Sequence, residues 1–137
     1  MMVILPSFRG LQKETWQTKA HTDLKTVQLA LEAYYKNNGH YPWTSNYQRT
    51  LISVVPQIIP NYLYDPFAPD KNTTYRYNLS LWDATRARYY IIYTYDIGYT
   101  GSGGCWPSGD EGSASVSDDG IVTTQGNIIW VSNGHLP

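Results

Sequence analysis

The first third of the chain has the residue spacing of an amphipathic helix. Between Ser7 and Asn38 there is no proline, and Gly10 is the only glycine. Apolar or small residues recur there at steps of three or four, at Ala20, Leu24, Val27, Leu31 and Tyr34 or Tyr35. This repeat places them on one face of an α-helix, with most charged residues off that face. The pattern predicts a helix of about 30 residues, or roughly 45 Å.

The two ends of this helix differ in character. Before Ala20, the only large apolar residues on the apolar face are Leu11 and Trp16. A helix that is polar nearly all round at one end is typical of a segment that projects from its domain or contacts partners. After Asn38, Gly39 supplies a left-handed cap, and Pro42 disfavours a second helical start. We therefore expect the helix to end at Asn38.

A short apolar run precedes the helix. Met1–Leu5 stops at Pro6. The run is too short to span a bilayer, which takes about 20 apolar residues, and it lacks the basic flank and cleavage site of a signal peptide. We interpret it as the end of a longer hydrophobic segment. The alternative is a natural start that packs on the core.

A connecting region and a hairpin follow the helix. Residues 39–72 hold five of the eight prolines, and we expect one short helix near Gln48–Val55. The stretches Thr73–Leu79 and Arg88–Asp96 are rich in β-branched and aromatic residues. They predict two antiparallel strands joined through Ser80–Ala87.

The last part of the chain predicts a loop and one more strand. Gly98–Gly120 is dense in glycine and serine, and Asn127–Ser132 has the composition of a strand. The sequence thus predicts a single α+β domain over residues 1–137. A long N-terminal helix (1–38) packs on a small antiparallel sheet (73–137), with a long Gly/Ser-rich acidic loop before the last strand.

Charge is unevenly distributed along the chain. The net charge is −1, which argues against a nucleic-acid partner. All ten Lys and Arg residues lie at or before Arg88, whereas five acidic residues follow it. Such a chain could bind a cation at one end or stack head to tail with its copies. Drift in composition between a solvated helix and a loop explains it equally well.

The acidic loop is a candidate calcium site. Calcium takes six to eight hard oxygen ligands, and this loop offers carboxylates and hydroxyls with no Lys or Arg nearby in the sequence. The candidate ligands are Asp118 and Asp119, then Asp110 and Ser117. Their spacing is not that of a helix-loop-helix calcium motif. A solvated acidic loop is the alternative.

The sequence offers no candidate catalytic site. Cys105 is the only cysteine, so no internal disulfide can form, and the three histidines are scattered. We expect a protein that is not an enzyme. The 13 Tyr and 5 Trp residues suit contacts with other molecules. A secreted or surface binding module could use an aromatic face of Trp82, Tyr89, Tyr93, Tyr95, Tyr99 and Trp106.

Several short motifs occur in order along residues 3–80. They are I-L-P-S-F at Ile4–Phe8, an acidic residue on the apolar face at Asp23, N-G-H-Y-P at Asn38–Pro42, and N-Y-L-Y-D-P-F at Asn61–Phe67, followed by Y-R-Y at Tyr75–Tyr77. Together they resemble the type IV pilin-like family. The chain is most similar to the soluble part of the major pseudopilin of type II secretion, with the N-terminal hydrophobic segment truncated. The lone cysteine departs from pilins that carry a C-terminal disulfide.

The resemblance implies a structural role in protein secretion. The subunit would assemble through its N-terminal helix into a periplasm-spanning pseudopilus or a type IV pilus-like filament. Its hydrophobic segment would lie in the bacterial inner membrane, with the globular part in the periplasm or in a cell-surface filament. Partners would be copies of itself, other pilin-like subunits and an inner-membrane assembly platform. A minor pilin or adhesin of the same fold is the alternative.

Two sites follow from this resemblance. Subunits would meet through the lower part of the helix, whose candidate contact residues are Phe8, Leu11, Lys13, Glu14, Trp16 and Lys19. In major pseudopilins the C-terminal loop resembles a calcium site built around paired aspartates. The resemblance implies that Asp118 and Asp119 are the corresponding pair in this chain.

Overall fold

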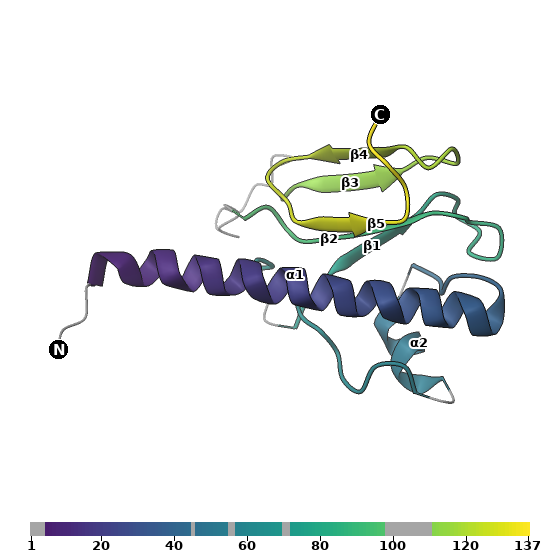
Figure 1. The fold of residues 1–137 in the computed structure, drawn as a ribbon, viewed down its shortest axis with the longest axis horizontal. Coiled ribbons are helices and arrows are strands. Elements are labelled where there is room, and N and C mark those ends of the chain that lie inside the picture. The colour runs from purple at the N-terminus through teal and green to yellow at the C-terminus, as the bar shows by residue number, and fades with distance from the viewer. Residues whose placement is uncertain (1–4, 45, 55–56, 70–71, 98–110) are drawn as a thin grey trace.

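The structure is a computed structural model that describes residues 5–44, 46–54, 57–69, 72–97 and 111–137, with side chains described from residue 14 onward. Within these ranges the elements follow one another as two helices and then five strands (Figure 1). They are α1 (Leu5–Asn38), α2 (Tyr47–Ser53), β1 (Arg76–Leu79), β2 (Tyr90–Tyr93), β3 (Ser113–Val116), β4 (Val122–Gln125) and β5 (Trp130–Ser132). The expected α+β class is confirmed.

Helix α1 has 34 residues, a length of roughly 51 Å at 1.5 Å per residue. It begins two residues before Ser7 and includes Pro6 in its first turn, where a missing N–H breaks no helical hydrogen bond. It ends at Asn38, as predicted. Gly39 has φ of 79°, and its N–H donates to the Tyr35 carbonyl at 2.7 Å. Glycine adopts this left-handed conformation at little cost, which explains the end of the helix.

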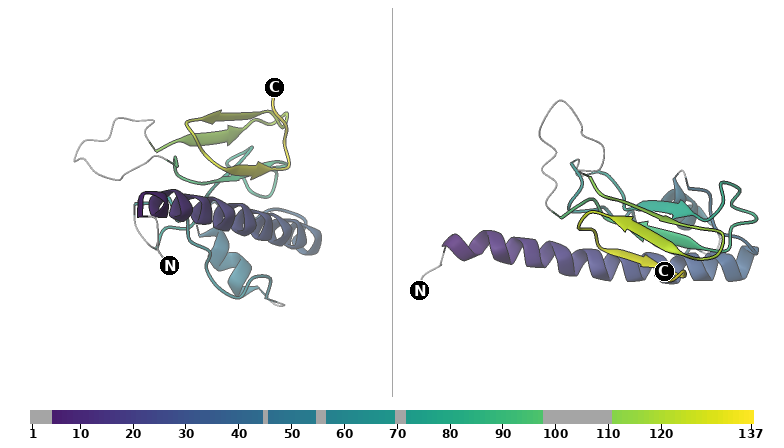
Figure 2. Two further views of the ribbon diagram at one scale, coloured as in Figure 1. Left: turned by 60° about the vertical axis from the view of Figure 1, so that its left-hand side comes forward. Right: turned by 90° about the horizontal axis from the view of Figure 1, so that it is seen from above.

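The domain has three layers (Figure 1). The middle layer is an antiparallel sheet in the order β1-β2-β5. Helix α1 covers one face of this sheet, and the β3-β4 hairpin lies on the other side, as the turned views also show (Figure 2). The predicted pairing of the first two strands is confirmed, and β5 lies within the predicted last strand.

Two apolar clusters hold the layers together. The apolar face of α1 packs on the side of the sheet that presents Tyr77, Tyr90 and Ile92. On the opposite side, Ile91 and Tyr93 pack against the hairpin. Because successive residues of a strand point to opposite faces, all four residues of β2 are buried. The α1 residues in the first cluster are Ala20, Leu24, Val27, Ala30, Leu31 and Tyr34.

The hairpin corrects the prediction of a continuous Gly/Ser-rich loop. Strand β3 forms within that stretch and pairs with β4, which was also not predicted. Residues alternate between exposed Ser113 and Ser115 and buried Ala114 and Val116. The alternation has the period of a strand, but its residues are small and polar, so β propensity alone gives a weak signal. Residues 98–110 of the predicted loop lie outside the described residues.

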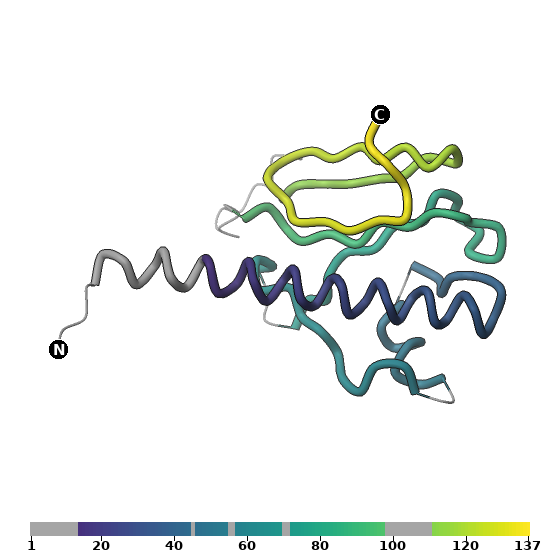
Figure 3. The backbone as a smooth tube through the Cα atoms, in the orientation of Figure 1, coloured from purple at the N-terminus to yellow at the C-terminus, as the bar shows by residue number. Residues whose placement is uncertain are grey.

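The connecting region packs along α1 and reaches the sheet. Helix α2 matches the short helix expected near Gln48–Val55, and its Leu51 is fully buried in the main cluster. The backbone tube shows the C-terminal half of α1 running along the sheet (Figure 3). The N-terminal part of α1 extends past the end of the sheet (Figure 1).

Candidate functional site

The first described side chains of α1 lie on an exposed helix surface. From Glu14 to Lys19 every side chain is exposed apart from Gln17, which is half-buried. Ala20 is the first fully buried residue among the described side chains of the helix. Three of the expected assembly residues, Glu14, Trp16 and Lys19, belong to this surface. The other three, Phe8, Leu11 and Lys13, lie outside the described side chains.

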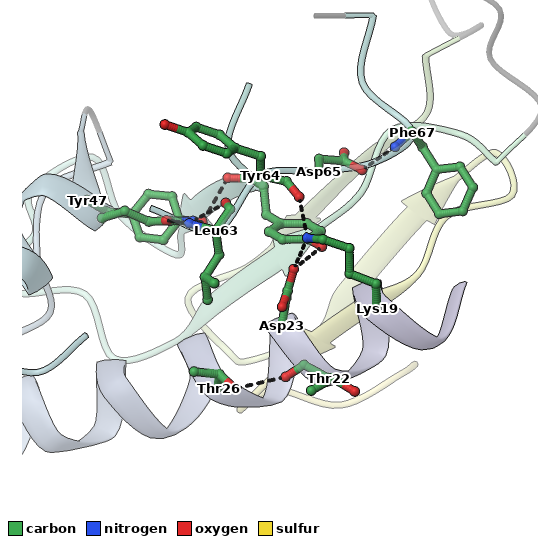
Figure 4. A network of polar contacts seen from close by, with 11 residues as sticks. Lys19, Thr22, Asp23, Thr26, Tyr47, Leu63, Tyr64, Asp65 and Phe67 are labelled. Atoms are coloured by element: carbon green, nitrogen blue, oxygen red, sulfur yellow. Dashed lines mark hydrogen bonds and ion pairs between the residues drawn. The ribbon is translucent and has the colours of Figure 1, made fainter. Parts of the chain in front are cut away.

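Two of these residues also contact their own domain. The Trp16 ring meets the Phe67 ring edge-on, with centroids 5.9 Å apart. Lys19 Nζ donates to the Tyr64 carbonyl at 3.0 Å and forms an ion pair with Asp23 (Figure 4). The contacts with Tyr64 and Phe67 join α1 to the connecting region, whereas the ion pair lies within α1. We name Trp16, Lys19, Asp23, Tyr64 and Phe67 the helix-docking cluster.

Asp23 and Asp65 extend this cluster into the sheet. Asp23 accepts a hydrogen bond from Tyr75 Oη at 2.7 Å. Asp65, which is only 2% exposed, accepts one from the Phe67 N–H at 2.8 Å and one from the Tyr95 N–H at 2.7 Å. The D-P-F sequence is therefore a structural turn that joins the connecting region to the end of β2.

Asp65 is a buried carboxyl group whose pKa is raised. Burial raises its pKa from the ordinary 3.8 to about 6, although both N–H donors and the nearby charges of Arg76 and Lys19 favour the ionised form. The folded state thus binds a proton more tightly than the unfolded state at this group. Its stabilising effect is full below about pH 4 and is lost as pH rises through 6.

This titration gives a testable pH dependence. Relative to Asp65→Asn, the wild-type free energy of unfolding should fall by about 3 kcal/mol between pH 3 and pH 8, because the pKa differs by about two units at 1.36 kcal/mol each. Urea unfolding of both proteins at several pH values measures the difference, in which the other titrating groups cancel. A difference that stays constant or rises across this window would contradict the assignment.

The expected calcium residues lie in the turn between β3 and β4. Gly120 N–H donates to the Ser117 carbonyl at 2.9 Å, and Ser117 N–H donates to the Ile121 carbonyl at 2.9 Å. Ser117 Oγ accepts the Ile121 N–H at 3.1 Å. Asp118 and Asp119 are exposed at the tip of this turn, and Asp110 lies outside the described residues. The structure therefore brings three of the four candidates together, two of them with carboxylates.

The surroundings of Asp118 differ from the sequence expectation. Arg86 and Arg88, from the β1-β2 connection, line the same surface depression as Asp118. Asp118 has no basic residue nearby in the sequence, but in the fold it shares this depression with two arginines. Among the described residues, no group of three His, Cys, Asp or Glu side chains could hold a metal ion.

Calcium takes six to eight oxygen ligands, which can come from carboxylates, hydroxyls, backbone carbonyls and water. Calcium binding by this turn stays a prediction. A bound ion stabilises the folded state by mass action. Equal melting temperatures in excess calcium and in a chelator would contradict it.

The expected aromatic face is not a single exposed surface in the described part of the chain. Trp82 is 85% exposed, but Tyr93 is buried and Tyr89 and Tyr95 are half-buried. Tyr99 and Trp106 lie outside the described residues. Tyr93 and Tyr95 instead flank the Arg76 guanidinium, at 4.6 and 4.1 Å from their ring centroids.

Arg76 is a structural residue that the sequence analysis did not single out. Its guanidinium donates to the carbonyls of Thr94, Glu111 and Gly112 at 3.0, 2.8 and 2.9 Å. These carbonyls lie on either side of residues 98–110 in the chain. Arg76 therefore fastens the hairpin to the sheet. The only sequence signal was an arginine between two tyrosines in a predicted strand.

Two further findings complete the description of the chain. In the described residues, no helix has both the length and the apolar composition needed to cross a bilayer. No protein-family model, curated protein or solved structure matches the chain.

Proposed function

We propose that this chain is a structural subunit of a type IV pilin-like filament, with the major pseudopilin of type II secretion as the most similar kind of subunit. The observation that supports this most is the division of α1 into two parts. From Ala20 onward the helix buries one face under the sheet. Its N-terminal part extends past the end of the sheet (Figure 1), and from Glu14 to Lys19 all side chains but Gln17 are exposed. It is not an enzyme in this proposal.

The division of α1 suits assembly by helix bundling. Subunits related by one repeated rotation and translation form a helical filament when their contacts are heterologous. Such contacts repeat only if each subunit holds its helix at the same angle. In the helix-docking cluster, Trp16, Lys19 and Asp23 join α1 to Phe67, Tyr64 and Tyr75, and these contacts favour one helix angle.

The cellular setting follows from the resemblance. A hydrophobic segment preceding α1 anchors the subunit in the bacterial inner membrane before assembly, and the globular part faces the periplasm or the outer wall of a surface filament. Copies of the chain, other pilin-like subunits and an inner-membrane platform are the partners. Exposed ion pairs contribute only about 0–1 kcal/mol each, so filament strength comes from repetition and from buried helix area.

Cysteine cross-linking in cells tests this arrangement. In a Cys105→Ser background, Thr18→Cys places a thiol on the exposed N-terminal part of α1, and Lys36→Cys places one in its last turn. The two positions are roughly 27 Å apart along the helix. When the product of the complete gene is oxidised in its native cells, we expect covalent dimers from Thr18→Cys and few from Lys36→Cys.

The same experiment separates the filament from the alternative functions. A secreted binding module predicts monomers for both variants, which would contradict the proposal. A minor pilin or adhesin of the same fold predicts cross-links to a different subunit instead of dimers of this chain. Mass spectrometry of the cross-linked bands distinguishes the two outcomes.

A further inference from the structure

A surface groove follows the free edge of β1. Its lining includes Thr44, Asn46, Tyr62, Thr74, Tyr77 and Asn78. Strand β1 is an edge strand because the sheet order is β1-β2-β5. Edge strands present backbone N–H and C=O groups that can pair with another chain. The groove is therefore a place where backbone recognition is possible.

The strand register shows which backbone groups of β1 point away from β2. Ser80 N–H donates to the Tyr89 carbonyl at 2.9 Å, so this pair is a hydrogen-bonded pair of the antiparallel ladder. Such pairs alternate along the ladder, and Tyr77 opposite Ile92 is a non-bonded pair. The N–H and C=O of Tyr77, and likewise of Leu79, point away from β2. Among the described residues, these groups have no hydrogen-bond partner.

The chain itself already pairs with the beginning of this edge. Tyr64 forms an antiparallel bridge with Thr74, and Asp65 N–H donates to the Thr73 carbonyl at 2.8 Å. Continued in the same register, residues 61 and 62 would lie opposite Tyr77 and Arg76. The edge is thus compatible with an added antiparallel segment.

Two residues of α2 divert the chain from that path. Gln48, which is 1% exposed, bonds both backbone groups of Leu63, through Nε2 to the carbonyl at 3.0 Å and Oε1 to the N–H at 2.7 Å. Tyr47 Oη donates to the Tyr75 carbonyl at 2.8 Å. Figure 4 shows Tyr47 and Leu63 near Tyr64, Lys19 and Asp23. The groove therefore begins where the chain's own segment leaves the edge.

We propose that this groove binds an extended, uncharged segment of another protein, which adds to the sheet as a strand beside β1. Alternating backbone donors and acceptors are matched by a β-strand, and main-chain hydrogen bonds supply the affinity in this mode of recognition. Of the described lining residues only Arg76 is charged, and its guanidinium is bonded to three carbonyls.

The recessed position of the edge favours a foreign segment over a second copy. Tyr62 and the Tyr47 end of α2 stand beside β1 as the walls of the groove. A second copy has the same residues beside its own β1. When two such edges approach each other, these residues obstruct pairing of the strands. A single extended segment has no such obstruction. This inference does not depend on the filament proposal.

Peptide selection followed by NMR tests the site. A random heptapeptide display library is selected on the immobilised chain, and the best peptide is synthesised and titrated into ¹⁵N-labelled protein. We expect the largest shifts at the Tyr77 and Leu79 amides, with slower hydrogen exchange at both. N-methylation of the peptide residue opposite Tyr77 should weaken binding about tenfold, the loss expected for one hydrogen bond.

Matched variants complete the test. Thr74→Glu places a charge in the groove, and Thr124→Glu places one on exposed β4 as a control. We expect about tenfold weaker binding for the first and no change for the second. Tyr62→Ala, which removes an exposed wall, tests the groove if Thr74→Glu does not fold. Chemical-shift changes elsewhere on the domain would overturn the proposal, as would peptide binding that N-methylation leaves unchanged. The same shift changes caused by self-association or by a soluble oligosaccharide would also overturn it.

Discussion

Replacing Leu24 with alanine is expected to lower the free energy of unfolding by about 3–4 kcal/mol, within the range seen for buried leucines. Leu24 is fully buried on the apolar face of α1 and belongs to the cluster that joins the helix to the sheet. The variant loses the transfer free energy of the side chain and leaves a cavity between two layers. Urea unfolding followed by circular dichroism measures the change.

Leu29→Ala is the matched control on the same helix. Leu29 is 72% exposed, so the same substitution should change the free energy of unfolding by less than about 0.5 kcal/mol. The contrast tests whether the three- and four-residue repeat correctly identifies the docked face. Similar losses from both variants would show that α1 is packed on more sides than the structure indicates.

Replacing Arg76 with methionine is expected to destabilise the domain by about 3 kcal/mol, given that one hydrogen bond to a charged group contributes 1.5–3 kcal/mol and neighbouring bonds are not additive. Methionine keeps much of the side-chain length but cannot donate to the carbonyls of Thr94, Glu111 and Gly112. The amide hydrogens of the β3-β4 hairpin should then exchange with solvent faster than those of the β1-β2-β5 sheet.

Arg86→Met controls for the loss of a positive charge. Arg86 is exposed in the β1-β2 connection, and its removal should change the free energy of unfolding by less than about 0.5 kcal/mol. Hydrogen exchange in the hairpin should stay at its wild-type rate. Equal effects from the two arginines would mean that net charge, and not the clamp between sheet and hairpin, determines stability.

The parts of the fold that were predicted correctly depend on local signals. The end of α1 follows from Gly39, whose positive φ is observed, and the docked face follows from the spacing of residues such as Leu24 and Leu31. The β1-β2 pairing follows from two strand-like stretches separated by a short connection. Each of these signals lies within a few residues of the element that it predicts.

The parts that were missed depend on contacts between distant segments. The β3-β4 hairpin consists of small and polar residues, and it is held by Arg76 and Asn78 from β1, which donate to its Gly112 and Ala114 carbonyls. No local pattern predicts such bonds. Two glycines flank the hairpin with positive φ, Gly112 and Gly126, and of these only Gly112 lies in the predicted loop.

The candidate sites were predicted only in part for the same reason. The exposed surface from Glu14 to Lys19 could be identified from the weak apolar face of this part of the helix. The contacts of Trp16 and Lys19 with the connecting region could not. The neighbourhood of Asp118 was misjudged because Arg86 and Arg88 are 30 or more positions away in the sequence and close in the fold. The sequence shows which residues are charged, but it does not show which of them lie close together in the folded chain.

Electron microscopy of filaments sheared from cells that overproduce the complete gene product tests the central claim most directly. The proposal predicts filaments that antibodies against this chain label along their whole length, with α1 helices packed at the filament centre. Recovery of the chain only as a dispersed monomer, with no labelled filament, would contradict it.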